Sequence, residues 1–499
     1  MTLKLTREPN LAAKQQGFSY QVEAVDALKD LQYGAVFHEQ GLGKTKIGVD
    51  LALVWLKTHA VDSVLIVTKK GLIQNWKDEL SLHSYVKPRV LLQDRRQNFY
   101  AFNSPARLYL THYEVLKSER KRMALFLKTR RVAVILDEAQ KIKNPESEVA
   151  KVLFALSSSF CRRVIMTGTP IANRPFDLWA QIYFLDHGAS LGDNFGLFKA
   201  DLDLANDLGR DRGKAARFEE ALGSVFQKIQ RFSVRETKRT ANIVLPDKEL
   251  KNILVDLEPR QAEIYETFRR EFAAIVVRDG APVLDDAEEI LKRLLRLVQV
   301  ASNPMLVDER YKGTPGKYPQ LENLVYEVVD AGEKAIVWTS FTDNVDWLAR
   351  ELHGFGAVRV HGKMSYEDRN KSLDVFKTRA DSKVLIATPG AAKEGLTLTV
   401  ANHAIFYDRS FSLDDYLQAQ DRIHRISQTR TCFVNNLIAR DTVDEWVDVL
   451  LAAKQLAARL GQGDITREEY SAEASYVFGD MVRDVLGMGE ATDGHKTNA

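Results

Sequence analysis

The sequence predicts an α/β protein of two tandem lobes, each a parallel sheet with helices on both faces, with helical insertions between the lobes. Short apolar runs recur along the chain, each followed by turn residues and a helix-compatible stretch, which is the alternation typical of parallel sheets covered by helices. The runs form two series separated by a charged stretch. At 499 residues the chain also exceeds what one hydrophobic core usually organises.

The two series of apolar runs predict the strands of the two lobes. The first series predicts strands at residues 35–37, 64–67, 108–110, 132–136 and 164–166. The second series follows the Gly/Pro-rich stretch KGTPGKYP and predicts strands at residues 335–338, 358–360, 384–387, 404–407 and 432–437. We therefore expect the first lobe to cover residues 1–185 and the second to cover residues 311–445.

The remaining segments favour helices. Residues 186–310 contain stretches such as DDAEEILKRLLRLVQV, whose leucines fall at helical spacing. We expect helical excursions and the inter-lobe connection there, with a strand return near residues 243–257. After Thr442, VDEWVDVLLAAKQLAARL is typical of an amphipathic helix that ends at Gly461 and Gly463. Residues 446–499 should therefore form a C-terminal helical extension and tail.

The composition indicates an ordinary globular protein, with 45% hydrophobic and 28% charged residues. No apolar run approaches the roughly 20 residues needed to span a bilayer, and the charged start MTLKLTREPN disfavours a signal peptide. We expect a cytoplasmic protein without membrane contact, and the compact core fits a prokaryotic or viral source. The net charge of +2 does not indicate a partner. One local basic cluster, which is either solvated surface or a nucleic-acid contact, consists of Lys228, Arg231, Arg235, Lys238 and Arg239.

A phosphate-binding loop is predicted after the first apolar run, where AVF is followed by HEQGLGKTK. Glycines in such a loop let backbone N–H groups approach phosphate oxygens, a lysine supplies charge to the outer phosphates, and a threonine hydroxyl can coordinate Mg²⁺. The predicted cofactors are therefore ATP and Mg²⁺, and the predicted nucleotide-binding residues here are Gly41, Leu42, Gly43, Lys44 and Thr45.

This loop departs from the full motif because His38 stands where the first glycine is expected. A glycine-rich turn without a ligand is one alternative, and a kinase or GTPase is another. The string VAVILDEAQ weakens the second alternative, because an apolar strand there ends in two adjacent acids. We assign Asp137 to the magnesium ion, together with Thr45, and Glu138 to the attacking water as general base. Such a pair of acids can also be only a helix N-terminal cap.

Several strings together resemble helicase superfamily two, and most closely its Swi/Snf-type DNA translocases, over nearly all of residues 18–446. In the first half these strings are FSYQVEAV, LIVTKKGLIQNWKDEL, DEAQKIKN and MTGTPIANRPFDLW. In the second half they are VRVHGKMSYEDR, VLIATPGAAKEGLTLT and YLQAQDRIHRISQ. The resemblance implies two RecA-like lobes and a nucleic-acid-stimulated ATPase that binds ATP between them.

The resemblance also implies roles for residues outside the phosphate loop. Gln21 would contact the adenine base, and Gly395 would contact the nucleotide. Gln418 would position the attacking water, while Arg422 and Arg425 would stabilise the transition state from the second lobe. An arginine supplied in this way raises the rate about a thousandfold or more. Because Arg422 and Arg425 are three residues apart, a surface ion pair on one helix face is the alternative.

Three threonines and one lysine are implied to contact the nucleic-acid backbone: Thr111, Thr169, Thr388 and Lys393. Hydroxyls at such positions hold a strand without reading its sequence. A buried threonine bonded to the protein backbone, or a solvated lysine, is the alternative at each position. The chain departs from the family pattern at Lys69, Ala172, Ala392 and Lys393, and we associate these departures with track contacts rather than with hydrolysis.

The predicted function is an ATP-dependent translocase that moves along double-stranded DNA and remodels or displaces bound partners. A strand-separating helicase acting on DNA or RNA is the first alternative, since related lobes serve that activity. A catalytically inactive nucleic-acid-binding scaffold is the second. Double-stranded DNA is the expected track, single-stranded DNA and RNA are the alternatives, and the residues identify no protein partner.

Overall fold

The computed structural model describes residues 5–92, 94–171, 173–203, 208, 211–241, 243, 245–278, 281–282, 287–391, 398–425 and 427–474. The chain divides into two compact units. The first unit comprises residues 1–203, 217–244 and 457–471, and the second comprises residues 204–216, 245–456 and 472–499. Each unit is built around one parallel sheet.

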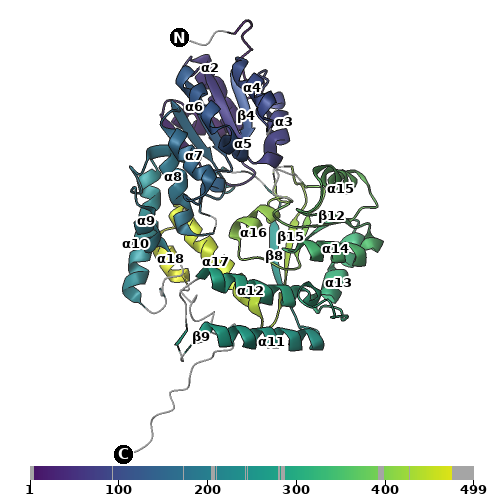
Figure 1. Ribbon diagram of the computed structural model, residues 1–499. Helices are drawn as coiled ribbons and strands as arrows, with labels where there is room; N and C mark the ends of the chain where they lie inside the picture. Colours follow the sequence, from purple (N-terminus) through teal and green to yellow (C-terminus); the bar gives the residue numbers. More distant parts are fainter. Residues whose placement is uncertain are drawn as a thin grey trace, which may run out of the picture. The chain divides into compact units, whose positions relative to one another are not determined.

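The first half of the chain alternates strands and helices, as the sequence predicts (Figure 1). Its strands are β1 (Tyr33–Val36), β2 (Ser63–Thr68), β3 (Arg89–Val90), β4 (Leu108–His112), β5 (Val132–Asp137), β6 (Arg162–Met166) and β7 (Ser233–Val234). Its α-helices are α1 (Ser19–Leu28), α2 (Lys44–Lys57), α3 (Ile73–His83), α4 (Arg95–Asn103), α5 (Tyr113–Ser118), α6 (Arg120–Thr129), α7 (Glu148–Ser157), α8 (Trp179–Asp186), α9 (Phe195–Leu202) and α10 (Arg212–Ile229). Short 3-10 helices are η1 (Lys70–Leu72), η2 (Ala139–Ile142) and η3 (Pro175–Leu178).

The sheet of the first unit has the strand order β3-β4-β2-β5-β6-β1-β7, with every neighbouring pair parallel. Parallel strands put all their carboxyl ends at one edge, which is where ligands bind in open sheets of this kind. The register is informative at that edge. Asp137 of β5 pairs with Met166 of β6, and Met166 pairs with Val36 of β1. The ends of β5 and β1 are therefore level, two strands apart.

The second half of the chain contains the strands β8 (Lys248–Val255), β9 (Val277–Arg278), β10 (Ala281–Pro282), β11 (Ala335–Trp338), β12 (Val358–Val360), β13 (Val384–Ala387), β14 (His403–Phe406) and β15 (Cys432–Ala439). Its α-helices are α11 (Pro259–Val276), α12 (Ala287–Ser302), α13 (Lys317–Asp330), α14 (Thr342–Glu351), α15 (Tyr366–Thr378), α16 (Leu413–Gln420), α17 (Val443–Gly461) and α18 (Arg467–Glu473). The 3-10 helices are η4 (Pro304–Leu306) and η5 (His353–Phe355). Helices α11 and α12 pack against each other (Figure 1).

The sheet of the second unit has the order β12-β13-β11-β14-β15-β8, again parallel throughout. Its two faces carry separate cores. Along β11, Ile336 and Trp338 belong to one buried cluster, whereas Ala335 and Val337 belong to the other. Successive side chains of a strand point to opposite faces, so both faces of this sheet are covered by apolar packing.

The predicted fold class is confirmed. The ten strands predicted for the two lobes are present, with boundaries that differ by at most two residues, and the predicted strand return near residues 243–257 is β8. The predicted C-terminal helix is α17, which ends at Gly461, and Gly463 adopts the left-handed conformation (φ 75°). The two-residue strands β3, β7, β9 and β10 were not predicted, because two residues carry no periodic signal. Among the described residues, no helix is both long and apolar enough to cross a bilayer.

Candidate nucleotide site

The predicted phosphate loop connects β1 to α2, and its turn depends on glycine. Gly41 and Gly43 have positive φ angles of 88° and 68°. The positive φ of Gly43 disfavours a larger residue there, and a Cβ atom at Gly43 would lie 2.4 Å from Nε2 of Gln21, so the Gln21 side chain would have to move. The same Nε2 atom donates a hydrogen bond of 3.1 Å to the carbonyl of Leu42. Gln21, the predicted adenine contact, is therefore bound directly to the phosphate loop.

Lys44 begins α2 and turns its ammonium group back onto the loop. Its Nζ donates to the carbonyl oxygens of His38 (2.9 Å) and Glu39 (3.2 Å), and its side chain is buried. Thr45 follows it and is half-buried. His38, at the position of the missing glycine, is buried, and burial followed by the charge of Lys44 lowers its pKa to about 4. Near pH 7 the imidazole is therefore neutral and adds no charge to the loop.

The two predicted acids lie at the end of β5. Oδ2 of Asp137 accepts hydrogen bonds from the indole of Trp76 (2.8 Å) and from the hydroxyl of Thr68 (3.0 Å). Glu138 follows with a φ of 54°, a conformation that is uncommon for residues other than glycine. Such strained backbone concentrates at functional sites. The Glu138 carboxylate accepts hydrogen bonds from Lys69 and Gln140.

The two acids have opposite pKa shifts. Burial, followed by the negative charge of Glu138, raises the pKa of Asp137 to about 6. Burial alone would also raise the pKa of Glu138, but the positive charges of Lys69 and Lys44 outweigh it and hold that pKa at about 2. Glu138 is therefore the member of the pair that stays ionised over the wider pH range.

Lys69 changes one interpretation made from the sequence. We associated this departure from the family pattern with track contacts. The structure places the Lys69 ammonium 3.1 Å from Oε2 of Glu138, with both side chains mostly buried, so its contact is with the carboxylate predicted to act as general base. The physical reason is its position directly after β2, which neighbours β5 in the sheet.

These residues fit a nucleotide and a magnesium ion. Among the described residues, no side chain caps the N terminus of α2, which leaves that end of the helix suited to an anion. No group of three or more His, Cys, Asp or Glu side chains in the described part of the chain could hold a metal. Mg²⁺ does not need such a group, because it is usually held by one or two carboxylates together with substrate phosphates and water. Thr45 and Asp137 are the residues predicted to hold such an ion.

The threonines predicted to contact nucleic acid are all buried. Thr111 lies within β4, has no exposed surface, and donates its hydroxyl to the carbonyl of Leu91 at 3.0 Å. For Thr111 the structure thus favours the alternative of a threonine bonded to the protein backbone. Thr169 follows β6 and Thr388 follows β13, each at the carboxyl edge of its sheet and each nearly buried.

The predicted residues of the second unit lie at and after the end of α16. Gln418 is buried on α16 and donates to Asp414 at 2.6 Å. The alternative for Arg422 and Arg425, a surface ion pair on one helix face, is not supported, because α16 ends at Gln420. Both arginines lie in the turns that follow, where Arg425 Nε donates to the carbonyl of Asp421.

Further side chains stabilise these turns in place of helical hydrogen bonds. Gln428 donates to the carbonyl of Ile423 (3.1 Å), and His424 Nε2 lies 3.0 Å from the carbonyl of Pro246. The predicted positions Gly395 and Lys393, and the departures Ala172 and Ala392, lie outside the described residues.

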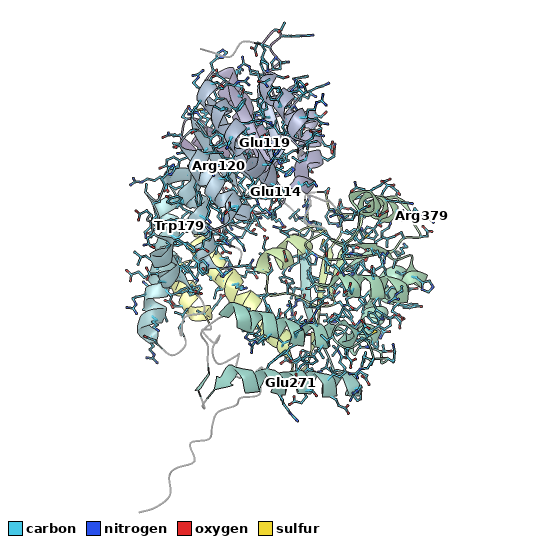
Figure 2. All side chains as sticks on the ribbon, in the orientation of Figure 1. Glu114, Glu119, Arg120, Trp179, Glu271 and Arg379 are labelled. Carbon is cyan, nitrogen blue, oxygen red and sulfur yellow. The ribbon has the colours of Figure 1, made fainter. Side chains whose placement is uncertain are left out.

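Sequence reasoning missed several partners of the site. Gln140 and Lys69 contact Glu138, and Thr68 contacts Asp137. The signal available for Thr68 and Lys69 was their position at the carboxyl end of a strand, the edge at which the acids were already expected. Lys141, just after the acids, forms an ion pair of 3.3 Å with Glu114, which is labelled in Figure 2.

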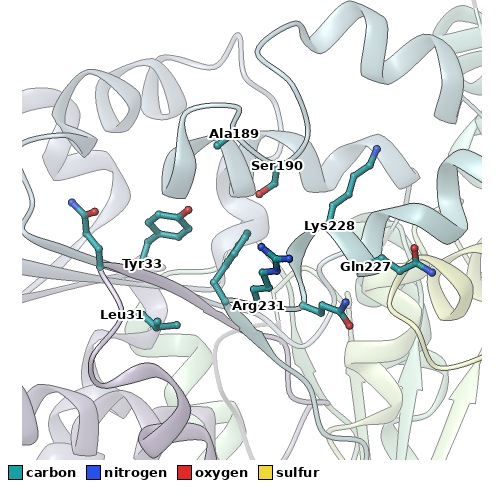
Figure 3. A pocket seen from close by; sticks show the side chains of 10 residues that line it. Leu31, Tyr33, Ala189, Ser190, Gln227, Lys228 and Arg231 are labelled. Atoms are coloured by element: carbon teal, nitrogen blue, oxygen red, sulfur yellow. The ribbon is translucent and has the colours of Figure 1, made fainter.

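The first unit also carries a groove of about 660 Å³ near the start of β1, the strand end opposite the phosphate loop (Figure 3). Leu31 and Tyr33 line it together with Ser190, Lys228 and Arg231. Two members of the predicted basic cluster thus lie on this groove and are exposed. Because the predicted ATP residues gather at the other edge of the sheet, the groove is separate from them.

Comparison with known proteins gives consistent matches. The model of the SNF2-related domain family matches residues 20–306, and the helicase conserved C-terminal domain matches residues 316–427. An uncharacterized ATP-dependent helicase of Mycoplasma pneumoniae is 28% identical over 454 residues, covering 88% of this chain and 41% of that protein. A putative ATP-dependent helicase/translocase of Bacillus subtilis is 28% identical over 454 residues, covering 86% of this chain and 46% of that protein.

The chain thus spans less than half the length of these curated relatives. Among solved structures, the Sulfolobus solfataricus SWI2/SNF2 ATPase core in complex with dsDNA is 25% identical. The match covers 97% of this chain and 99% of that chain, with a TM-score of 0.41.

Proposed function

The chain belongs to the SNF2-related family, the Swi/Snf-type ATPases of helicase superfamily two, and from this premise we propose that it is an ATP-dependent translocase on double-stranded DNA. In this proposal ATP hydrolysis moves the protein along the duplex and remodels or displaces bound partners. The observation that carries the proposal is the register through Asp137, Met166 and Val36. This register supports a single nucleotide site, because the phosphate loop and the two acids follow β1 and β5, whose carboxyl ends lie at the same edge and height of one sheet.

The proposed chemistry divides among the residues of the first unit. Lys44 binds the outer phosphates, exchanging its present carbonyl partners for phosphate oxygens. Thr45 and Asp137 hold Mg²⁺, which when bound neutralises charge on the phosphates. Glu138 orients the attacking water and accepts its proton. Gln21, anchored on Leu42, contacts the adenine base.

We further assign Gln418, Arg422 and Arg425 of the second unit to the same reaction. The guanidinium groups would stabilise charge in the transition state, and Gln418 would orient the water. Thr169 and Thr388 are the proposed backbone contacts to the track. We place this activity in a prokaryotic cytoplasm, a proposal supported by the bacterial relatives.

The deciding experiment compares ATP hydrolysis with duplex DNA, single-stranded DNA and RNA at one fixed salt concentration. We expect duplex DNA to stimulate most, because the resemblance is to duplex translocases, and we expect the wild type to displace a triplex-forming strand without unwinding the duplex. Glu138→Gln should keep ATP binding and lose turnover. Near-normal hydrolysis by that variant would remove Glu138 from the proposed role.

Strand separation is the second candidate, because the names of the curated relatives include helicase. It predicts stimulation by single strands together with unwinding of a duplex that has a single-stranded tail. An inactive scaffold predicts nucleic-acid binding without hydrolysis under any of these conditions. The intact set Lys44, Asp137 and Glu138 argues against the scaffold.

A further inference from the structure

Two consecutive residues at the end of β2 hold the two consecutive acids at the end of β5. The parallel register of these strands pairs Val67 with Leu136, the residue before the acids. Thr68 then donates to Asp137 at 3.0 Å, and Lys69 donates to Glu138 at 3.1 Å. The residues in both contacts have the same sequence separation as the paired residues Val67 and Leu136. The register of the two strands therefore also sets these side-chain contacts.

The environment of Lys69 makes its contact more specific than a surface ion pair. The Lys69 side chain is 21% exposed and that of Glu138 is 15% exposed, so solvent screens the pair only partly. Gln140 donates to the same carboxylate oxygen, Oε2, that Lys69 contacts. Two donors on one oxygen restrict the orientation of the carboxylate.

The backbone conformation of Glu138 explains why its side chain needs this support. A φ of 54° at a glutamate is strained and persists only where the surroundings hold it. The Glu138 carboxylate must be held in one position, because a misplacement of about 1 Å can cost a hundredfold in rate. A cation from the neighbouring strand supplies that constraint.

We propose that Lys69 is a positioning residue of the hydrolytic reaction, holding the Glu138 carboxylate in the orientation that receives the attacking water. The inference rests on the proposed function, in which Glu138 acts on that water. Lys69 itself contacts neither ATP nor the water in this proposal. Its effect should therefore appear in the turnover number and not in nucleotide affinity.

The test uses the full chain with Mg²⁺, ATP and saturating duplex DNA. Lys69→Met keeps the length of the side chain and removes its charge. It should lower kcat about tenfold, which is less than the roughly 10²–10⁴-fold contribution of a general base. The KM for ATP should stay within about twofold of wild type. Lys69→Arg keeps the cation and should restore most of the loss. Lys69→Gln serves as a second neutral variant if the methionine variant folds poorly.

Lys70→Met is the matched control, since Lys70 is the adjacent residue, is exposed, and carries the same charge. It should leave kcat unchanged. Glu138→Gln is measured in parallel to separate the positioning role of Lys69 from the proposed role of Glu138. Loss of turnover in Glu138→Gln with normal turnover in both neutral Lys69 variants would overturn the positioning role alone. Normal turnover in Glu138→Gln would overturn the proposed function and this inference with it. A raised KM with unchanged kcat in Lys69→Met would assign Lys69 to nucleotide binding instead.

Discussion

The indole nitrogen of Trp76 donates a hydrogen bond of 2.8 Å to Oδ2 of Asp137, joining α3 to the end of β5 inside the first unit. Trp76 has no exposed surface, and Asp137 is nearly buried. A buried carboxylate that loses a hydrogen-bond donor keeps its desolvation cost, so this single bond supports both the stability of the unit and the orientation of the acid.

We therefore predict that Trp76→Phe lowers the free energy of unfolding by about 1–3 kcal/mol and lowers ATP turnover at the same time. Trp55→Phe is the control, because Trp55 is equally buried and its indole donates at 2.8 Å to the carbonyl of Lys29, away from the acids. That variant should lose comparable stability and keep its turnover. Chemical denaturation and steady-state hydrolysis check both. Equal turnover losses in the two variants would contradict the specific role of Trp76.

Asp137 also predicts a pH dependence of stability in metal-free buffer. Its folded pKa is about 6, against an ordinary 3.8, so the folded protein binds more protons than the unfolded chain between these values. The contribution of Asp137 to stability therefore falls as the pH rises through that window, and above it the buried charge is destabilising.

We predict that Asp137→Asn, which stays neutral, is more stable than wild type near pH 7.5, by at most about 3 kcal/mol. Near pH 4 this advantage should disappear, because Asp137 is then protonated in the folded wild type. The opposite shift at Glu138, to a pKa of about 2, affects both proteins and acts at lower pH. Urea unfolding of both proteins at the two pH values, with a chelator present, checks this. An advantage that grows toward acid pH would contradict the prediction.

The sequence was most informative about strands and about the ends of strands. Runs such as residues 335–338 are buried on both faces of a parallel sheet, so they read as continuous apolar segments with clear limits. The acids Asp137 and Glu138 were found because they follow such a run. Lys69 follows one too, but its partner depends on strand order, which places β2 beside β5 and which local sequence does not encode.

The end of α16 shows a second limit. The three-residue spacing of Arg422 and Arg425 suggested a shared helix face as the alternative, whereas the chain turns after Gln420. Beyond that point Gln428 donates to the carbonyl of Ile423, and the His424 ring lies within hydrogen-bonding distance of the carbonyl of Pro246, which is distant in sequence. Such tertiary hydrogen bonds compete with helical ones and leave no periodic signal.

Arg235, from the predicted basic cluster, is an internal structural residue of the first unit. Its guanidinium binds both carboxylate oxygens of Asp464, with Nε to Oδ1 at 2.6 Å, and donates to the carbonyl of Phe37 at 2.7 Å. Phe37 directly precedes His38 at the start of the phosphate loop. The pair therefore attaches the segment 457–471 beside that loop.

We predict that Arg235→Ala and Asp464→Ala are strongly coupled. Asp464→Ala should lower stability by about 1–2 kcal/mol, and Arg235→Ala should cost more, because it also removes the bond to Phe37. The double variant should resemble Arg235→Ala, giving a coupling energy of about 1 kcal/mol or more. Chemical denaturation of the four proteins measures this coupling. Simple additivity would show that the two side chains do not act as a pair.

The buried cation Lys317 offers the sharpest stability test in the second unit. Lys317 has no exposed surface, forms an ion pair with Asp444 at the start of α17, and donates to the carbonyl of Tyr407 at 3.0 Å. Asp444 also accepts a hydrogen bond of 3.0 Å from the backbone of Ala439. Removing the cation alone leaves the buried Asp444 carboxylate without a compensating charge. The resulting loss of stability is larger than the net stabilisation that the intact pair provides.

We therefore predict that Lys317→Met lowers the free energy of unfolding by about 3–5 kcal/mol, and that adding Asp444→Leu recovers part of this loss although two native residues are then missing. Arg379→Met is the control: Arg379 pairs with Asp381 at 2.7 Å, but both side chains are more than half exposed, so its stability should match wild type within error. Urea unfolding of the four proteins checks the order. Removing Asp444 relieves an effect of uncompensated charge, but it does not relieve a loss of packing. A double variant less stable than Lys317→Met would therefore assign the loss to packing.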